Sequence, residues 1–500
     1  MSPAVGRGTI YLYLQFLSSI IAGYIFWIFI TKFTTTETIG NFALVISLSE
    51  IFANIAIMGI PDGIQRFLAK SFSEKKLRDA KVFVKISLIF LSIGIVSSST
   101  LILIFSGWFL NTFGIPLNFI IIIDLLLASY ATYLVLYSIV IASLKTKVLP
   151  IIIIVSSGSR LVVGTILVLM DAGIFGLALG YTFLGHTLSS ILLAVVIIKL
   201  VKVSESNKKA DVVGIKFASK NLLTAGVVAW IPNLITTVGL ELGTLVVFGT
   251  QGPDQSGIYF IVITLVSGIN SILYSLFTIA LPVLSSMLDG RKRFAWETIR
   301  MSSIIMMPIS SSLIFYAKDI MQLFSPSYVE GALSFQILLL SVFPATVAGG
   351  VETLVYSYGH YRRSLAITIV MNLPRAILYF ILVPNYGVTG AGISYTIGAL
   401  IGFGMSVIVA KRIPMRFAWK NLLLVLVIPI VINFLVAALH ITYIIGIPLT
   451  LIISYLILIR LKIFTRSDIL YLIELLPYRI SEPLLRWLAK IEKAFGKFYD

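Results

Sequence analysis

The stretch Gly173-Ile-Phe-Gly-Leu-Ala-Leu-Gly-Tyr-Thr182 recurs later in the chain as Gly387-Val-Thr-Gly-Ala-Gly-Ile-Ser-Tyr-Thr396. The glycine, tyrosine and threonine positions that the two copies share are all separated by one constant offset. A second match joins Gly40-Asn-Phe-Ala-Leu-Val-Ile-Ser-Leu48 to Gly257-Ile-Tyr-Phe-Ile-Val-Ile-Thr-Leu265, at almost the same offset. Two independent matches at nearly one offset predict that the chain contains an internal duplication.

The duplicated stretches lie within a series of long apolar segments. About 20 apolar residues cross a bilayer as a helix, and continuous apolar runs such as residues 119–127 lack the alternation of a transmembrane barrel. The chain is 58% hydrophobic and 12% charged, whereas a soluble domain carries about a quarter charged residues. We therefore expect an all-α integral membrane protein with 14 transmembrane helices, near residues 9–31, 39–60, 82–106, 116–144, 148–170, 173–198, 221–248, 255–288, 299–317, 332–358, 364–383, 387–410, 421–439 and 441–459.

The basic residues indicate the orientation of these helices. Most of the 38 lysines and arginines fall at the N-terminus, in every second gap between apolar segments, or in the C-terminal tail. Lys32 and Lys318 lie in the other gaps. Since basic loops stay on the cytoplasmic side, we expect a multi-pass protein of the plasma membrane with both termini in the cytoplasm. Each copy of the duplication holds six segments, an even number, so the two copies are parallel repeats.

This pattern predicts five regions along the chain. Residues 1–200 form an N-terminal six-helix lobe, residues 201–220 a cytoplasmic linker, and residues 221–411 a second six-helix lobe. Residues 412–461 add two transmembrane helices, and residues 462–500 form a basic cytoplasmic tail. Near the end of the tail, apolar residues recur every three or four positions with basic residues between them, as in a helix lying on the membrane surface. Docking onto a partner protein is the alternative.

Several classes of function are excluded by what the sequence lacks. The net charge of +17 is spread over loops rather than gathered on one module, so nucleic acid is not an expected partner. The chain has no cysteine and no phosphate-binding loop, zinc-protease motif or nucleophile elbow. Its histidines, His186, His360 and His440, are isolated, so no metal site is expected. We expect a protein that is not an enzyme.

Two arginines fall inside apolar segments. Arg160 and Arg375 each lie about 12 residues into their segment, which is about 18 Å along a helix. A charge at the bilayer centre costs about 2.5–3.5 kcal/mol on insertion scales. The functional interpretation is a pair of cations for an anionic substrate, because the guanidinium fork suits phosphate. The alternative is that each arginine pairs with a carboxylate or carbonyls of its own lobe.

Three acidic residues are candidates for ion coupling or for pairing with these arginines. Glu50 lies near the middle of its apolar segment, and Asp124 and Glu241 lie nearer the outer face. Carboxylates inside a membrane carry protons or pair with cations. Glu50 is thus a candidate proton carrier or a partner for Arg160, although a helix contact is the simpler interpretation.

The residues around the two arginines also carry a family resemblance. Arg160 followed by Gly173-x-x-Gly176, the segment 375–391, and the segment 59–69 with Arg66 occur in the order found in polysaccharide transporters. The chain resembles the polysaccharide transporter and Wzx-type flippase branch of the multidrug/oligosaccharidyl-lipid/polysaccharide (MOP) exporter superfamily. The resemblance implies two six-helix lobes around a cavity that opens alternately to each side. It also implies that Arg66, Arg160 and Arg375 bind an anionic head group.

The resemblance favours a flippase that moves polyprenyl-(pyro)phosphate-linked oligosaccharide by alternating access, for polysaccharide or glycoprotein synthesis. Fourteen segments suit the flippases better than the drug exporters, which generally have twelve. The first apolar segment has no arginine, unlike the lipid II branch, which counts against lipid II. Expected partners are the lipid-linked sugar, membrane lipids and glycan-assembly enzymes. We expect a monomer, with no cofactor beyond a coupling Na⁺ or H⁺.

Two other functions remain open at this point. An ion-coupled multidrug-type exporter would have a cavity dominated by carboxylates and aromatic residues, whereas the matched charges here are arginines. A membrane-embedded glycosyltransferase or acyltransferase would need a group of acidic or histidine residues, and the outer loops carry acidic residues singly.

Overall fold

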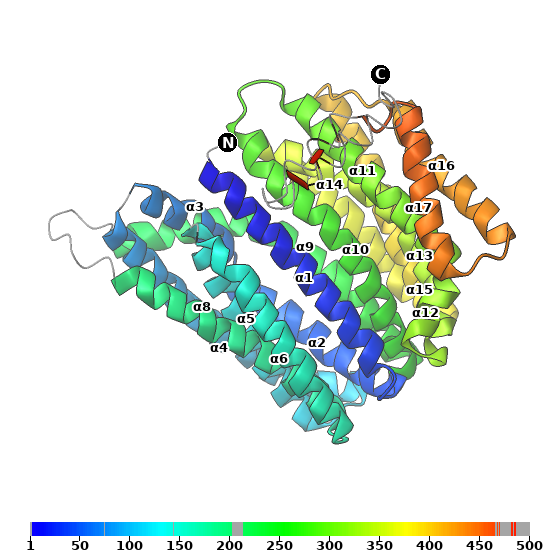
Figure 1. Ribbon diagram of the computed structural model, residues 1–500. Coiled ribbons are helices and arrows are strands. Elements are labelled where there is room, and N and C mark those ends of the chain that lie inside the picture. The colour runs from blue at the N-terminus through cyan, green and yellow to red at the C-terminus, as the bar shows by residue number, and fades with distance from the viewer. Residues whose placement is uncertain are drawn as a thin grey trace. The chain divides into compact units, whose positions relative to one another are not determined.

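The computed structural model describes residues 3–74, 76–143, 145–202 and 214–465, together with residues 468, 470, 482, 483, 485 and 486. All elements of this described part are helices (Figure 1). Eleven of them are long and apolar enough to cross a membrane, or up to 12 if the bent pair Pro326–Leu339 and Val342–Ser357 is one span. The expected all-α fold is confirmed, and the helices indicate a multi-pass membrane protein.

The count of 14 transmembrane helices stays a prediction. It differs from the count of 12, in which the bent pair is one span, at two places. The first apolar segment contributes the apolar stretch Ser18–Ile30, which is shorter than a full span. The segments 364–383 and 387–410 correspond to two helical parts of α15 (Tyr361–Arg412) that meet at a kink at Gly387, and α15 counts as one span.

One compact unit comprises residues 17–261 and 376–391. In it, α2 packs against α5 and α9, and α8 packs against α5 and α6 (Figure 1). The indole Nε1 of Trp230 on α9 donates to the carbonyl oxygen of Asn54 on α2, at 2.6 Å. The helices that lie within this unit are α2 (Thr36–Ile57), α3 (Ile60–Ser73), α4 (Leu77–Phe113), α5 (Leu117–Ala142), η1 (Thr146–Val148), α6 (Leu149–Leu169), α7 (Gly173–Phe175), the π-helix η2 (Gly176–Phe183), α8 (Leu184–Lys202) and α9 (Ile215–Gln251).

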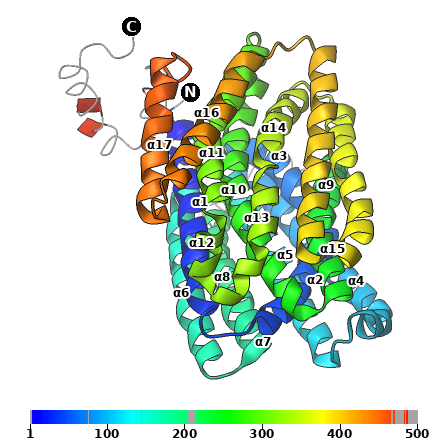
Figure 2. The same cartoon turned by 90° about the vertical axis from the view of Figure 1, so that its right-hand side faces the viewer.

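The second unit comprises residues 1–16, 262–375 and 392–500. Here α11 packs against α14, α16 and α17 (Figure 2) around buried apolar residues such as Ile299, Val351 and Leu422. The amide of Asn433 on α16 donates to the hydroxyl of Ser311 on α11, at 3.0 Å. The helices of this unit are α11 (Arg291–Phe315), α12 (Ala317–Phe324), η4 (Pro326–Gly331), α13 (Ala332–Leu339), α14 (Val342–Ser357), α16 (Trp419–Ala438) and α17 (Tyr443–Arg460).

Three helices contribute residues to both units: α1 (Pro3–Ile30), α10 (Pro253–Ser286) and α15 (Tyr361–Arg412). The lobes at residues 1–200 and 221–411 are defined by the repeated sequence, whereas the two compact units are defined by contacts. The division into lobes stays a prediction. Most of the expected linker, at 203–213, and most of the expected amphipathic tail lie outside the described residues.

The duplicated stretch begins in both copies with a glycine of positive φ. Gly173 precedes the π-helix η2 with φ of 51°, and Gly387 interrupts α15 with φ of 52°. This left-handed region is strained for residues that have a Cβ atom. In the second copy, the amide of Gln251 on α9 donates to the carbonyl oxygens of Val383 and Pro384, at 3.1 Å each. The repeated glycines therefore mark an equivalent chain break.

The other repeated glycines, Gly40 of α2 and Gly257 of α10, lie against each other's helices. A Cβ atom on Gly40 would collide with the carbonyl oxygen of Pro253, and a Cβ atom on Gly257 with that of Thr36. The sequence offset that relates Gly40 to Gly257 also relates Thr36 to Pro253. The contact is thus reciprocal, as expected where two copies meet about a two-fold axis. Small residues allow membrane helices to approach this closely.

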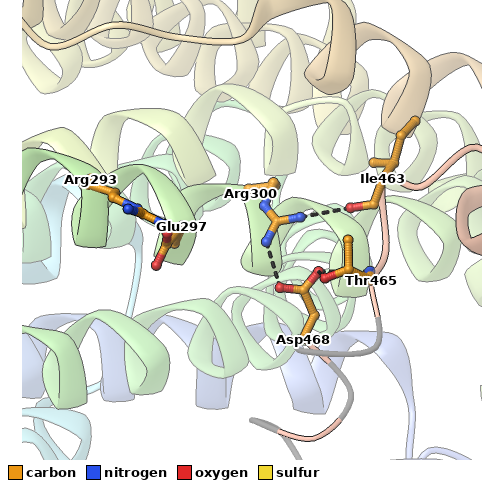
Figure 3. Close-up of polar contacts among 6 residues, drawn as sticks. All are labelled: Arg293, Glu297, Arg300, Ile463, Thr465 and Asp468. Atoms are coloured by element: carbon orange, nitrogen blue, oxygen red, sulfur yellow. Dashed lines mark hydrogen bonds and ion pairs between the residues drawn. The ribbon is translucent and has the colours of Figure 1, made fainter. Parts of the chain in front are cut away.

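The start of the C-terminal tail is attached to α11 (Figure 3). The Nη2 atom of Arg300 donates to the carboxylate of Asp468 at 2.5 Å, and its Nη1 donates to the carbonyl oxygen of Ile463 at 2.8 Å. The other oxygen of Asp468 accepts hydrogen bonds from the backbone and hydroxyl of Thr465. The ion-paired side chains are 15% and 10% exposed. Because this ion pair is partly buried, it contributes more to stability than a pair exposed to solvent.

We predict that Asp468→Ala destabilises the protein. It leaves the partly buried guanidinium of Arg300 without its carboxylate, which costs about 1–3 kcal/mol. Glu297→Ala is the matched control, because Glu297 pairs with Arg293 on the same helix and both are exposed, so its loss costs about 0.2–1 kcal/mol. Thermal unfolding in detergent measures both, and equal melting temperatures for the two variants would contradict the prediction.

Candidate functional site

The side chain of Arg160 crosses from α6 to α8. It lies over Gly185 so closely that a Cβ atom there would collide with its Nε and Cγ atoms. Its charge interacts with His186 of α8 and with Tyr130 and Tyr133 of α5. We call these residues, with Tyr137, the Arg160 cluster. A glycine at position 185 is therefore required for the arginine to reach this place.

The rings of the Arg160 cluster form a continuous series. Residues 130, 133 and 137 share one face of α5 because they are three and four positions apart. His186 lies 5.0 Å from the Tyr130 ring and is stacked on Tyr133 at 5.5 Å, with an interplanar angle of 17°. Tyr137 follows at 5.6 Å from Tyr133. His186 thus acts as a packing residue through its ring.

Two of the three candidate carboxylates come together in the same unit. Glu50 of α2 interacts electrostatically with Glu241 of α9, and both carboxylates also interact electrostatically with Tyr130. The hydroxyl of Ser47 donates to Glu241 at 2.6 Å. Neighbouring carboxylates in an apolar environment share a proton or hold a cation, because both cannot be charged without cost. Asp124 of α5 is half-buried, and its Oδ1 has no hydrogen-bond partner within the described part of the chain.

Arg375 of α15 lies in the other unit and is 3% exposed. Its Nη1 donates to the side-chain oxygen of Asn372 at 3.0 Å, and its Cζ lies 3.8 Å from the centroid of the Tyr395 ring. A Cβ atom on Gly398 would stand 2.7 Å from the Cβ of Arg375 and 3.1 Å from its Nε. We call Asn372, Tyr395 and Gly398 the Arg375 cradle. As with Arg160, a glycine makes room for the guanidinium.

A carboxylate lies near this cradle but is held by hydroxyl groups. Oε1 of Glu352 on α14 accepts hydrogen bonds from Ser364 at 2.7 Å and from Thr368 at 3.1 Å. Tyr274 of α10 interacts electrostatically with Arg375, Tyr395 and Glu352. Across the residues that the structure describes, no carboxylate forms an ion pair with Arg375. The charge is compensated by a ring and an amide instead.

The third candidate arginine lies elsewhere. Arg66 is exposed on α3, with its guanidinium 5.6 Å from the centroid of the Phe67 ring. No interaction joins it to Arg160 in the described part of the chain. The structure therefore connects Glu50, Glu241 and Arg160 through Tyr130, and places Arg66 outside this group.

Sequence reasoning missed the partners of both arginines. Tyr395 belongs to the repeated stretch, and Asn372 precedes Arg375 by three positions, the spacing of neighbours on one helix face. These two signals were present in the sequence. The packing of the two arginine side chains on Gly185 and Gly398 could not be predicted from the sequence, because it depends on how two helices cross. Among the described residues, no group of three or more histidine, aspartate or glutamate side chains is placed to hold a metal ion.

We predict that Gly185→Ala and Gly398→Ala lower the melting temperature, because the added Cβ displaces a buried guanidinium at a cost of about 1–3 kcal/mol. Gly158→Ala on α6 and Gly404→Ala on α15 are matched controls, since no atom lies within 4 Å of their Cβ positions. The controls should be neutral or stabilising, because alanine favours helix. Thermal unfolding of the four variants tests this prediction. It would be wrong if Gly185→Ala and Gly398→Ala were as stable as the two controls.

Comparison with known proteins places the fold. No protein-family model and no curated protein sequence matches the chain. Among solved structures, the lipid II flippase MurJ in an inward closed conformation aligns with a TM-score of 0.67 and 19% identity, over 92% of this chain and 99% of that one. An inward-facing multidrug resistance MATE family transporter aligns with a TM-score of 0.63 and 14% identity, over 81% and 98%. A MOP superfamily transporter from Pyrococcus furiosus, described as having a binding pocket of reverse polarity, aligns with a TM-score of 0.59 and 15% identity, over 82% and 95%. The chain therefore has the fold of transporters of the MOP superfamily.

Proposed function

We propose that the protein is a flippase that moves a polyprenyl-(pyro)phosphate-linked oligosaccharide across the plasma membrane by alternating access. Arg160 and Arg375 bind the anionic head group. The protein acts without enzymatic chemistry and crosses the membrane 14 times, with the break at Gly387 separating two of the spans.

The observation that carries this proposal is the buried charge of Arg375. It is 3% exposed, and its compensation comes from Asn372 and Tyr395 rather than from a carboxylate. An unpaired charge inside a protein is costly and is retained where it serves a purpose. Arg160 stands at the corresponding place in the other copy of the duplication and also lies on a glycine.

The chemistry of this arrangement suits an anion. A guanidinium offers parallel N–H donors that match two oxygens of one phosphate. Matched arginines repel cations, so they disfavour a cationic drug as cargo. The likeness to MurJ, whose description is a lipid II flippase, supports lipid-linked cargo in general. The absence of arginine from the first apolar segment still counts against lipid II itself.

One observation favours a second candidate, the ion-coupled exporter. Glu50 and Glu241 lie close enough to interact, and a pair of carboxylates suits H⁺ or Na⁺. The same pair serves equally well as the coupling site of a flippase. An ion drives transport in either case only if it binds one conformation better than the other.

We predict that Arg160→Ala and Arg375→Ala each reduce translocation of a fluorescent lipid-linked oligosaccharide at least about tenfold, because hydrogen bonds to charged groups contribute about 1.5–3 kcal/mol. The assay uses proteoliposomes and accessibility to an added quencher. Arg293→Ala, which removes an exposed arginine, is the control and should keep wild-type activity. Full activity of the doubly substituted Arg160→Ala, Arg375→Ala protein would remove both arginines from the mechanism.

We also predict that Glu50→Gln and Glu241→Gln abolish the response of transport to an imposed H⁺ or Na⁺ gradient. Glutamine neither releases a proton nor carries the charge that holds a cation. Downhill equilibration of the lipid-linked probe should persist in both variants. Flux is measured with and without each gradient. A gradient response that survives in both variants would exclude this pair as the coupling site.

A further inference from the structure

The guanidinium of Arg375 is compensated in an unusual way for a buried cation. The Tyr395 ring, itself 8% exposed, covers one face of the guanidinium with a centroid distance of 3.8 Å. Attraction between a cation and a ring face stabilises the charge without using any N–H donor. The ring therefore partly compensates the charge of the arginine and leaves its hydrogen-bonding edges available.

The amide of Asn372 occupies one of these edges and is itself fixed. Its Nδ2 donates to the carbonyl oxygen of Thr368 at 3.0 Å, which aims Oδ1 at the Nη1 of Arg375. The hydroxyl of Thr368 donates in turn to Glu352 at 3.1 Å. This chain of hydrogen bonds holds a neutral acceptor against the guanidinium and keeps the nearby carboxylate engaged with hydroxyl groups.

The opposite edge of the guanidinium lacks a partner. The Nε of Arg375 is buried and has no hydrogen-bond acceptor among the residues that the structure describes. Gly398 lies beside it, and a Cβ atom there would stand 2.7 Å from both the Cβ of Arg375 and the carbonyl oxygen of Met371, so glycine allows this close approach. The Nε and Nη2 donors point in parallel along this edge, which is the geometry that receives two oxygens of one phosphate.

We propose that Asn372, Tyr395 and Gly398 form a cradle that holds Arg375 without an ion-pair partner from the protein. The Nε edge of this guanidinium then binds one phosphate group. The inference rests on the proposed function and adds three positioning residues to it. Asn372 orients the guanidinium, Tyr395 stabilises its charge, and Gly398 provides the space for the arginine side chain. A carboxylate at position 372 would weaken phosphate binding, because it would form an ion pair with Arg375 within the protein.

The test is Asn372→Asp, which replaces the amide by a carboxylate of the same shape 3.0 Å from Nη1. The purified, full-length protein in nanodiscs is titrated with a polyprenyl monophosphate and, separately, with inorganic pyrophosphate. We expect affinity for the polyprenyl phosphate to fall at least about tenfold, since charge-assisted hydrogen bonds are lost, while the melting temperature stays equal or rises. Asn385→Asp is the control, because Asn385 is exposed on the same helix, and it should bind like wild type.

Wild-type affinity in Asn372→Asp would overturn the cradle. If this variant fails to insert, Tyr395→Phe and Tyr395→Leu decide the question. Phenylalanine keeps the ring face and should retain affinity, whereas leucine removes it and should weaken binding several-fold. Equal affinity of these two variants would also overturn the proposal.

The two probes distinguish the source of the phosphate. Binding of the polyprenyl phosphate supports a lipid head group, whereas binding of pyrophosphate alone would overturn that assignment in favour of a soluble anion. Translocation by Arg375→Ala separates this inference from the function on which it rests. If that variant is inactive while Asn372→Asp binds normally, the function stands and the cradle is wrong. If it is fully active, Arg375 has no part in the proposed function.

Discussion

A guanidinium inside an apolar helix bundle loses its water, and the protein must supply something in its place. Arg375 receives a tyrosine ring and an asparagine amide, and Arg160 lies beside His186, Tyr130 and Tyr133. Aromatic rings stabilise a cation while leaving its donors available, which a carboxylate does not. In the proposed function, this choice of partner connects the packing of each unit to the capture of an anion.

Glycine makes this arrangement possible. Gly185 and Gly398 stand where each arginine must cross to the neighbouring helix, and any side chain there would occupy the same volume. Within the first unit, Gly59 and Gly226 bring α3 and α9 into backbone contact in the same way. Helices in lipid gain little from hydrophobic burial against one another, so close van der Waals approach between small residues replaces it.

Much of the fold could be predicted because hydrophobic length is a local property. The apolar segments lie on helices, and the repeated stretch located the chain breaks at Gly173 and Gly387. The number of spans was harder, because the two helical parts of α15 meet at a kink at Gly387 and count as one span, and the described apolar part of α1 is short. Arg160 and Arg375 stood out as charges within apolar sequence. The approach of Glu50 to Glu241 was not predictable, because these residues are far apart in the sequence and meet only when α2 packs on α9.

The reciprocal contact between Gly40 and Gly257 has a consequence for the origin of the chain. A surface that fits its own duplicate also fits a second copy of itself. In a half-length ancestor with six helices, this one glycine would therefore have allowed two copies to assemble as a parallel homodimer. Joining two such genes end to end would preserve the dimer interface within one polypeptide and would free each half to acquire different polar residues, such as the tyrosines around Arg160 and the asparagine beside Arg375.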